Sequence, residues 1–462
     1  MNETVDARGF SCPQPVMMLV KKMKEMKTGS FDILVDDETA GENVCRTAEG
    51  KGWLIRGINN IEDYSKISVC TKQKNIMKKN SDTIYADNAA TTWPKPQCVI
   101  ESMRNFFFNV GANPGRSGHR MSVNSARILF DAREETAAFF GLDNSQNVVF
   151  TLNATHALNI AIRGIPKKEG HVIISSFEHN SVIRPLTYLK EKEKTTISVV
   201  PVDCKGNFDM TEFKKSFRDN TQFVVINRGS NVTGAIAPIR QIGHVCKEKK
   251  VPLIVDVAQT AGTIPINVKK DNIDILIFTG HKGLMGPQGT GGLCLNNESL
   301  QSFFHGGTGS SSQEERHPDF MPDKLEAGTP NIIGIAGLAT GIKYLRSIGL
   351  NTIVEKEKFL IKKLINGLRD NDKIIIYGPD SRQERLGILS FNIKNKAADI
   401  VGDLLDKEFS IMTRVGLHCA PYAHKSIGTF PAGTVRLSLS FMNTENDIAK
   451  IVSAVNNIAD RS

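Results

Sequence analysis

The sequence of 462 residues predicts an α/β protein with a large doubly wound sheet, a smaller α+β region at its C-terminal end and a small two-layer sandwich at its N-terminal end. Hydrophobic residues make up 40% of the chain and charged residues 23%, a balance typical of a globular protein with a large core. Short apolar runs rich in β-branched residues alternate with helical patterns through the middle of the chain, as in buried parallel sheets. The length exceeds one ordinary domain.

Residues 1–70 are expected to form the small sandwich. Apolar residues recur with helical spacing in VMMLVKKMKEMK, residues 16–27, and a second helix is expected over residues 38–52. Strand-like runs complete a β-α-β-α-β-β order; they lie at 31–37, 52–58 and 64–70. The lysine-rich segment 71–82 has little apolar content, which is typical of a linker.

Residues 83–345 are expected to form the large domain, and residues 346–462 the smaller one. Apolar runs predict the buried strands of the large sheet. These runs are NVVFTL (147–152), HVIISSF (171–177), TISVVPV (196–202), QFVVIN (222–227), VPLIVDV (251–257) and DILIFTG (274–280). Helical patterns at 355–368 and 445–459 belong to the smaller domain.

Charge and cysteine content narrow the class of protein. The net charge of +9 fits either an anionic partner such as tRNA or a solvated basic surface, but residues 1–80 carry 13 basic and 11 acidic side chains, so the sandwich is not basic. The eight cysteines include no CxxC pair, and we expect neither a metal site nor a disulfide framework. Without a membrane-length apolar run or a secretory signal pattern, a cytoplasmic protein is expected.

The glycine-rich turn after the strand at 274–280 contains Lys282. Most lysines are surface charges, but burial lowers the pKa of an amine and allows it to form a Schiff base with an aldehyde. Asp256 ends the strand at 251–257, where it could cap a helix or protonate the pyridine nitrogen of pyridoxal phosphate. With Gln259 three residues further on, the order Asp256, Gln259, Lys282 favours a pyridoxal phosphate site.

Further segments fit a phosphate-bearing cofactor. Ala154 and Thr155 begin a helix after a strand, and helix N-termini bind phosphate. His179 follows another strand, where its imidazole could stack on the cofactor ring. Asn231 lies in the glycine-rich turn NRGSNVTG.

Seven motifs in this order resemble those of class V aminotransferase-fold enzymes, specifically the cysteine desulfurase and selenocysteine lyase family. They are YADNAATTWPKP, FEHNS, SNVTG, DVAQTAG, TGHK, EAGTPN and RVGLHCAP, and they run from about Ile84 to the C-terminus. The resemblance implies the fold of type I pyridoxal phosphate-dependent transferases, with a mostly parallel seven-stranded sheet. It also implies a homodimer that acts on L-cysteine.

The resemblance assigns a role to each residue singled out above. Lys282 would carry the cofactor, Asp256 would pair with its pyridine nitrogen, and Gln259 would contact its phenolic oxygen. His179 would stack on the ring, and Asn231 would lie beside a cofactor oxygen or the substrate. The phosphate would be held by Thr155, Thr279 and His281 beside Ala154, with Thr329 reaching the phosphate of a partner subunit. His119 would lie near the substrate or have a structural role.

The segment RVGLHCAP favours a desulfurase over a transaminase. Arg436 matches the family position that clamps the substrate α-carboxylate, and Cys419 matches the position that forms a persulfide, although a lone loop cysteine can also be inert. Basic neighbours, Arg414 and His418, are expected to favour the Cys419 thiolate. The segment resembles the second group of these enzymes, which depend on a separate sulfur acceptor. An inserted stretch with His424 leaves the substrate preference open.

The segment DARGFSCPQP resembles the signature of the TusA-like sulfur-carrier family. Cys12 precedes Pro13 and a predicted helix start, where the helix dipole favours a thiolate that can accept sulfane sulfur. Cys45, in the second predicted helix, is expected to be structural. Asp6, Gly9 and Pro15 also match the signature.

The main hypothesis is a pyridoxal phosphate-dependent cysteine desulfurase that forms a persulfide on Cys419 and relays the sulfur to Cys12 of its own or the partner subunit's carrier domain. One alternative is a selenocysteine lyase that delivers selenium to the carrier. Another is a non-catalytic sulfur-relay adaptor. A transaminase or epimerase would have no use for Cys419. The downstream acceptor is left open, and contact with tRNA is expected only through a downstream enzyme.

Overall fold

A computed structural model describes residues 3–26, 30–61, 63–71, 83–115, 118–165, 168–296 and 300–461. The chain divides into two compact units, Met1–Asp82 and Thr83–Ser462. Most of the expected linker, residues 72–82, lies outside the described residues. None of the described helices is both long and apolar enough to cross a membrane.

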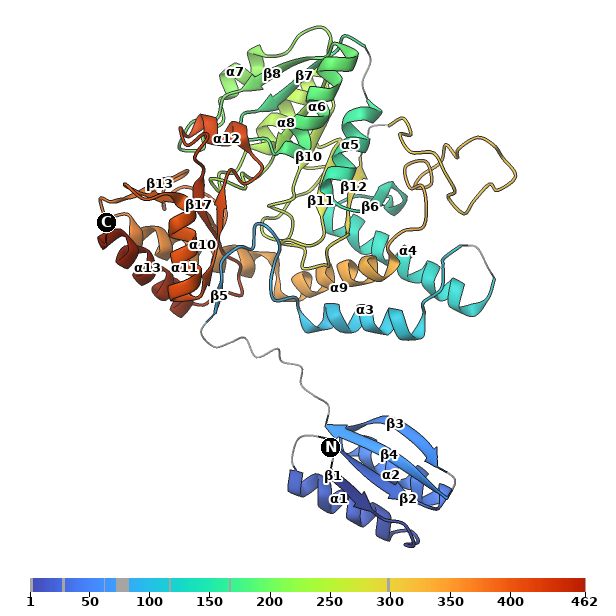
Figure 1. Ribbon diagram of the computed structural model, residues 1–462. Helices are drawn as coiled ribbons and strands as arrows, with labels where there is room; N and C mark the ends of the chain where they lie inside the picture. Colours follow the sequence, from blue (N-terminus) through green and yellow to red (C-terminus); the bar gives the residue numbers. More distant parts are fainter. Residues whose placement is uncertain are drawn as a thin grey trace. The chain divides into compact units, whose positions relative to one another are not determined.

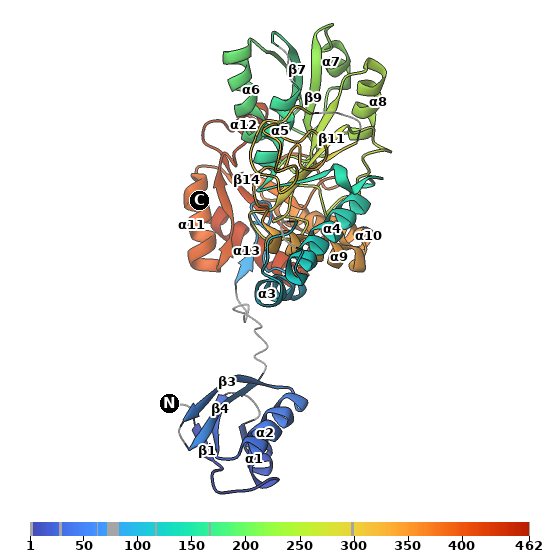
Figure 2. The same ribbon diagram turned by 90° about the vertical axis from the view of Figure 1, so that its right-hand side faces the viewer.

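The N-terminal unit is a four-stranded sheet covered on one face by two helices (Figures 1 and 2). Its elements are β1 (Glu3–Asp6), α1 (Gln14–Met26), β2 (Ser30–Val35), α2 (Glu38–Gly50), β3 (Trp53–Ile61) and β4 (Tyr64–Thr71). The strand order is β1-β2-β4-β3, in which β1 and β2 are parallel and the other neighbours antiparallel. Leu19 and Val44 of the helices pack on Phe31 and Ile33 of the sheet. The predicted β-α-β-α-β-β sandwich is confirmed.

The C-terminal unit is built around a seven-stranded sheet with the order β6-β12-β11-β10-β9-β7-β8. Its strands are β6 (Val148–Thr151), β7 (His171–Ser175), β8 (Thr196–Val200), β9 (Thr221–Asn227), β10 (Leu253–Asp256), β11 (Ile275–Thr279) and β12 (Gly291–Leu295). Only β12 runs against the other six. This confirms the mostly parallel sheet.

Six of these strands coincide with the six apolar runs in the sequence, whereas β12 does not. It begins with two glycines, which are typical of a turn. A Cβ at Gly292 would lie 2.4 Å from the Val149 carbonyl oxygen and 2.5 Å from the Phe278 ring. Close packing of β12 between its neighbours therefore requires glycine where a strand pattern would show a branched residue.

Helices cover both faces of this sheet, and consecutive strand residues alternate between the two cores. Val148 belongs to the core that contains α4, α8 and α9, whereas Val149 belongs to the core that contains α5 and α6. The helices of this region are α3 (Gln97–Asn109), α4 (Arg120–Phe140), α5 (Ala154–Gly164), α6 (Asn180–Glu193), α7 (Met210–Lys215), α8 (Ile239–Lys249) and α9 (Ile332–Ile348), with a 3₁₀ turn at Ser145–Asn147.

The smaller part of this unit is an antiparallel sheet of order β13-β14-β17-β16, against which helices pack to form a separate core (Figure 1). Its elements are α10 (Leu350–Leu368), β13 (Ile374–Tyr377), β14 (Ile388–Ile393), α11 (Ala398–Phe409), β15 (Ile411–Met412), β16 (Arg414–Gly416), α12 (Pro421–Ser426), β17 (Thr434–Ser438) and α13 (Glu445–Asp460). The first strand of the unit, β5 (Ile84–Tyr85), pairs in parallel with β15.

Candidate active site

A cavity of about 210 Å³ lies at the carboxyl ends of the parallel strands, where ligands bind in open α/β sheets. The small domain closes one side of it with residues from β16, β17 and the loop between them. The cavity brings together twelve residues singled out from the sequence: Ala154, Thr155, His179, Asn231, Asp256, Gln259, Thr279, His281, Lys282, Arg414, His418 and Arg436.

Lys282 lies in the turn after β11, and its partly buried side chain lines the cavity. Burial lowers the pKa of Lys282 to about 8, an effect that Arg436 and Arg414 reinforce and the nearby Asp256 opposes. About a tenth of the amine is therefore neutral at pH 7, far more than for a solvated lysine. A neutral amine is the form that attacks a carbonyl.

Asp256 ends β10, and burial raises the pKa of its carboxyl, against the effects of a hydrogen bond from the Ala258 N–H (2.8 Å) and of Lys282. A second buried acid, Glu178, lies near it. Glu178 Oε1 accepts hydrogen bonds from Ser175 Oγ (2.6 Å) and the Asn227 N–H (2.8 Å), and burial raises its pKa to about 8. At pH 7 Glu178 is thus largely protonated, and Asp256 is the carboxyl of this pair that lies beside Lys282 in the cavity lining.

His179 caps α6 and faces the cavity. Its Nδ1 accepts a hydrogen bond from the Ser181 N–H (3.1 Å), and burial, aided by the charge of Lys282, lowers its pKa to about 4. The ring is therefore neutral at pH 7. Ser181 Oγ also bonds to Thr155 Oγ1 at 2.7 Å, so Ser181 connects His179 to the start of α5. Ser181 was not singled out from the sequence, although it stands in the FEHNS motif.

Asn231 Oδ1 and His281 Nδ1 are two of the buried polar atoms of cavity-lining residues that have no partner among the described residues. The main chain of His281 is held instead: its carbonyl oxygen accepts hydrogen bonds from Lys95 Nζ (2.6 Å) and the Thr92 N–H (3.1 Å). A ligand in the cavity could satisfy the two unpartnered atoms.

Arg436 is fully buried in β17 and is fixed from two sides. Its Nη2 pairs with Asp87 Oδ1 at 2.6 Å, and its Nη1 donates to the Asn231 carbonyl oxygen at 3.1 Å. Its Nε, also buried, has no partner among the described residues. Arg414 lies directly opposite Arg436 in the pairing of β16 with β17. The two guanidinium groups give this side of the cavity a positive charge that suits a carboxylate.

Cys419 is exposed in the loop between β16 and α12, and Arg414 Nη2 donates to its sulfur at 3.4 Å. Consecutive residues, His418 and Cys419, adopt left-handed φ angles of 49° and 58°, a costly conformation for residues with side chains. Asn231 Nδ2 donates to the His418 carbonyl oxygen (2.6 Å) and the Asn180 N–H to the Cys419 carbonyl oxygen (2.8 Å). The large domain thus fixes the position of the thiol.

The expected contribution of His418 to a Cys419 thiolate is wrong. His418 is buried, its Nε2 bonds to Thr434 Oγ1 at 3.1 Å, and burial beside Arg436 lowers its pKa to about 2. It packs against the buried His424, whose ring centroid is 5.5 Å away. His418 is therefore a neutral part of the loop support, and the positive charge beside the sulfur comes from Arg414.

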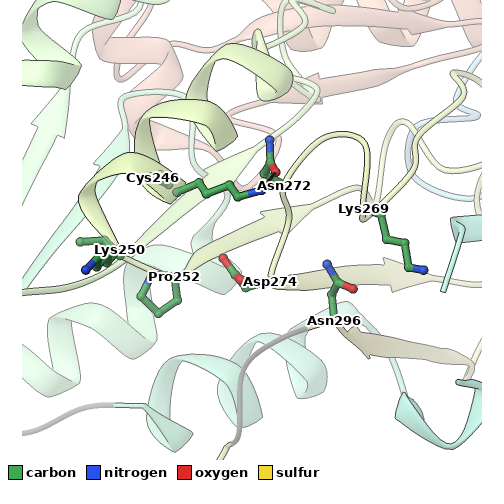
Figure 3. A pocket seen from close by; sticks show the side chains of 9 residues that line it. Cys246, Lys250, Pro252, Lys269, Asn272, Asp274 and Asn296 are labelled. Atoms are coloured by element: carbon green, nitrogen blue, oxygen red, sulfur yellow. Dashed lines mark hydrogen bonds between the residues drawn. The ribbon is translucent and has the colours of Figure 1, made fainter. Parts of the chain in front are cut away.

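Besides Cys419 and Cys12, two further predicted site residues do not line this cavity. Thr329 lines a separate cavity of about 550 Å³, together with His156 and Phe304. His119 caps α4, where its Nδ1 accepts a hydrogen bond from the Ser122 N–H at 3.2 Å. A lysine-lined pocket of about 430 Å³ lies at the opposite edge of the sheet, where β10 and β11 begin (Figure 3). It contains none of the predicted residues.

In the N-terminal unit, Cys12 is exposed in the turn between β1 and α1. Asn43 of α2 donates from Nδ2 to the Cys12 sulfur at 3.3 Å. The turn is also held to the residue that follows β2, because the Gly9 N–H donates to Asp36 Oδ2 at 2.6 Å.

Comparison with known proteins identifies two families. The model of the aminotransferase class V family matches residues 84–451, and that of the sulfurtransferase TusA family matches residues 3–70. A probable cysteine desulfurase of Pyrococcus abyssi is 34% identical over 79% of this chain and 92% of its own length. One of Methanothermobacter thermautotrophicus is 33% identical over 82% and 95%. A solved cysteine desulfurase of Thermococcus onnurineus superposes with a TM-score of 0.78 at 32% identity, covering 82% of this chain and 95% of its own.

Proposed function

The chain belongs to the cysteine desulfurase family of class V aminotransferases and carries a TusA domain at residues 3–70, and from this premise we propose that it converts L-cysteine to L-alanine and relays the sulfur from Cys419 to Cys12. The observation that carries the proposal is the position of Cys419. Its sulfur is 3.4 Å from the guanidinium of Arg414, which itself lines the cavity with Lys282 and Arg436.

Pyridoxal phosphate fits this cavity. The fit rests on an enclosed lysine with a lowered pKa, on a buried carboxyl beside it, and on the unpartnered Asn231 Oδ1 and His281 Nδ1. The residues that would hold the cofactor are Lys282, Asp256, Gln259, His179, Ala154, Thr155, Thr279, His281 and Asn231. When bound, pyridoxal phosphate supplies an electron sink for bond changes at the substrate carbons.

The chain's own residues account for substrate binding and sulfur capture. Arg436, with Arg414 beside it, would bind the α-carboxylate, and Asp87 keeps the Arg436 guanidinium in place. The Cys419 thiolate would attack the substrate sulfur. A bond forms between the two sulfur atoms, the substrate Cβ–S bond breaks, and a proton replaces sulfur at Cβ to give alanine. Lys282 Nζ, whose pKa of about 8 lets it both give and take a proton near neutral pH, is the group suited to move protons there.

The TusA domain supports the relay to Cys12. Cys12 is exposed, lies just before α1, and so combines access with the positive end of a helix dipole. A tether between donor and acceptor raises their effective concentration. The acceptor thiol belongs either to the same chain or to a second copy.

A second copy is part of the proposal, because family resemblance assigns Thr329 to the site of a partner subunit. The cavity that Thr329 lines also contains Leu152 and Phe304, whose side chains are 58% and 47% exposed. Contact with another copy would cover these apolar groups. Light scattering should give the mass of a dimer, and a monomer at micromolar concentration would contradict this part.

L-Selenocysteine is the alternative substrate. L-Selenocysteine differs from L-cysteine only in selenium for sulfur, so its α-carboxylate would meet the same two arginines, Arg414 and Arg436. Parallel turnover measurements on L-cysteine and L-selenocysteine decide which of the two is the preferred substrate. Strong preference for L-selenocysteine would replace the proposed substrate.

Mass spectrometry of the full chain after treatment with L-cysteine tests the relay. We expect alanine release and persulfides on both Cys419 and Cys12 in the wild type. Cys419→Ser should abolish both persulfides, whereas Cys204→Ser, which removes another exposed thiol, should match the wild type. Sulfur on Cys12 in the Cys419→Ser variant, or none on Cys12 in the wild type, would overturn the relay.

A further inference from the structure

Asn43 contacts the sulfur of the carrier domain from a different helix. It lies in α2 and its Nδ2 donates to Cys12 Sγ at 3.3 Å across 31 residues of sequence. The two helices lie side by side on one face of the sheet (Figures 1 and 2). Asn43 is half-buried, while Cys12 is exposed. The packing of α2 therefore fixes the position of the Asn43 amide, which donates to the solvent-facing sulfur of Cys12.

Several of the charged groups at this end of the domain are acidic, and Arg8, a cation in the same turn, is paired with Asp6 (2.7 Å). Asp36 accepts the Gly9 N–H, and Asp37 caps α2 by accepting the Thr39 and Ala40 N–H groups. Exposed carboxylates follow at Glu38 and Glu42 on the same helix. Such carboxylates repel a sulfur anion on Cys12. A neutral donor that points at the sulfur offsets part of this repulsion.

The donor at Cys419 is a cation instead. Arg414 Nη2 lies 3.4 Å from that sulfur, and charged donors stabilise an anion more strongly than neutral ones. In sulfur exchange, a better-stabilised thiolate leaves faster, whereas a thiolate with a weaker donor keeps more of its nucleophilicity. The two donors thus favour Cys419 as the leaving sulfur and Cys12 as the attacking one.

We propose that Asn43 is a positioning residue of the carrier site: it orients the Cys12 sulfur and stabilises it as an anion without the loss of nucleophilicity that a cationic donor would bring. This role rests on the proposed relay. In the transfer, Cys12 gives up its thiol proton and its sulfur bonds to the sulfane sulfur of the Cys419 persulfide. The bond between that sulfane sulfur and Cys419 Sγ breaks, Cys419 leaves as a thiolate, and no external oxidant or reductant is consumed.

Rapid-quench mass spectrometry of the full chain tests this role with Asn43→Ala and the isosteric Asn43→Asp. After L-cysteine is added, sulfur on Cys12 is measured against sulfur on Cys419 in the same digest, which separates transfer from loading. We expect transfer to slow about tenfold in Asn43→Ala, the scale of a hydrogen bond to a charged group, and further in Asn43→Asp. Asn59→Ala, an exposed amide on β3 at the opposite edge of the sheet, should match the wild type.

A second readout needs no L-cysteine. The rate of Cys12 alkylation by iodoacetamide should fall in the same order, from wild type through Asn43→Ala to Asn43→Asp, while alkylation of Cys45 stays constant. A purely structural role would leave the isosteric Asn43→Asp close to the wild type. Wild-type transfer in Asn43→Asp would overturn the role and leave the relay standing. Absence of sulfur on Cys12 in the wild type, with Cys419 loaded, would overturn the relay and with it this role.

Discussion

Cys419 and Cys12 are both exposed thiols, but the groups around their sulfur atoms differ in charge and in burial. Cys419 lies on a loop with two left-handed residues, beside Arg414, which lines the cavity with Arg436 and Lys282. Cys12 lies in an open turn near carboxylates and the Asp6-paired Arg8, with a neutral amide from Asn43 at its sulfur.

In the proposed relay the two thiols have separate tasks. Removing sulfur from an amino acid requires binding of a carboxylate and a fixed nucleophile, and both depend on buried charge and a constrained backbone. Accepting sulfur requires an accessible thiol, which the exposed turn provides. The variants below change one side of this contrast at a time.

The largest effect is expected at the buried cation. Arg436→Met should lower kcat/KM for L-cysteine by about a hundredfold or more, mainly through KM, because a desolvated partner of the substrate carboxylate is lost. Asp87→Asn keeps the guanidinium and removes only its anchor, so its effect should be smaller. Steady-state kinetics of alanine release measures both. Equal losses in the two variants would contradict a direct role of Arg436 in substrate binding.

Burial of Lys282 predicts a pH dependence. Because its pKa is lowered to about 8, the neutral amine fraction rises about tenfold between pH 6 and 7 and levels off above about pH 9. Capture of pyridoxal phosphate by the cofactor-free protein should follow this curve, measured by borohydride trapping and peptide mapping. A rate that keeps rising to pH 10, as expected for a solvated lysine, would show that the side chain is not enclosed.

The substitution Arg414→Met removes the cation at the Cys419 sulfur and so makes the surroundings of this thiol more like those of Cys12. Alkylation of Cys419 by iodoacetamide at pH 7 should slow about fivefold to tenfold, since a charged donor to the sulfur anion is removed. Cys12 in the same sample serves as the internal reference. Arg382→Met removes an exposed arginine paired with Asp380 and should leave the Cys419 rate unchanged. An unchanged rate in Arg414→Met would show that the charge of Arg414 does not activate the Cys419 thiol.

The smallest effect is expected in the open turn. Gly9 has φ +75° and a Cβ there would meet nothing within 4 Å, so Gly9→Ala should destabilise the N-terminal unit by about 1 kcal/mol, through backbone conformation alone. Gly57→Ala, at an equally open position without a positive φ, is the control. Hydrogen exchange of residues 3–70 reports the change. A loss of several kcal/mol would show that this turn is as constrained as the Cys419 loop.

Sequence patterns predicted the parts of the site that strand ends bring together. Asp256, Asn231 and Lys282 each follow an apolar run, and parallel strands deliver such residues to one edge of a sheet. The pattern failed at β12, where close packing requires glycine.

Sequence patterns could not predict the protonation state of buried side chains or which residues far apart in the chain make contact. His418 stands next to Cys419 in the chain, but only its burial shows that it is neutral. Asp87 and Arg436 are 349 residues apart, and nothing in either segment indicates that they pair. Asn43 likewise reaches Cys12 only through the packing of two helices. Helical and strand periodicity describe single elements, whereas these contacts depend on how elements meet.

The short pairing of β5 with β15 has a consequence for the design of fusion proteins. Asp87, which anchors Arg436, follows β5 closely, and Ala89 already lines the cavity. A module joined ahead of Ile84 is therefore attached only a few residues in sequence before residues of the enzyme's cavity. A truncation that begins after Asp87 would remove part of the enzyme itself. The boundary that separates the two units without this loss is Thr83.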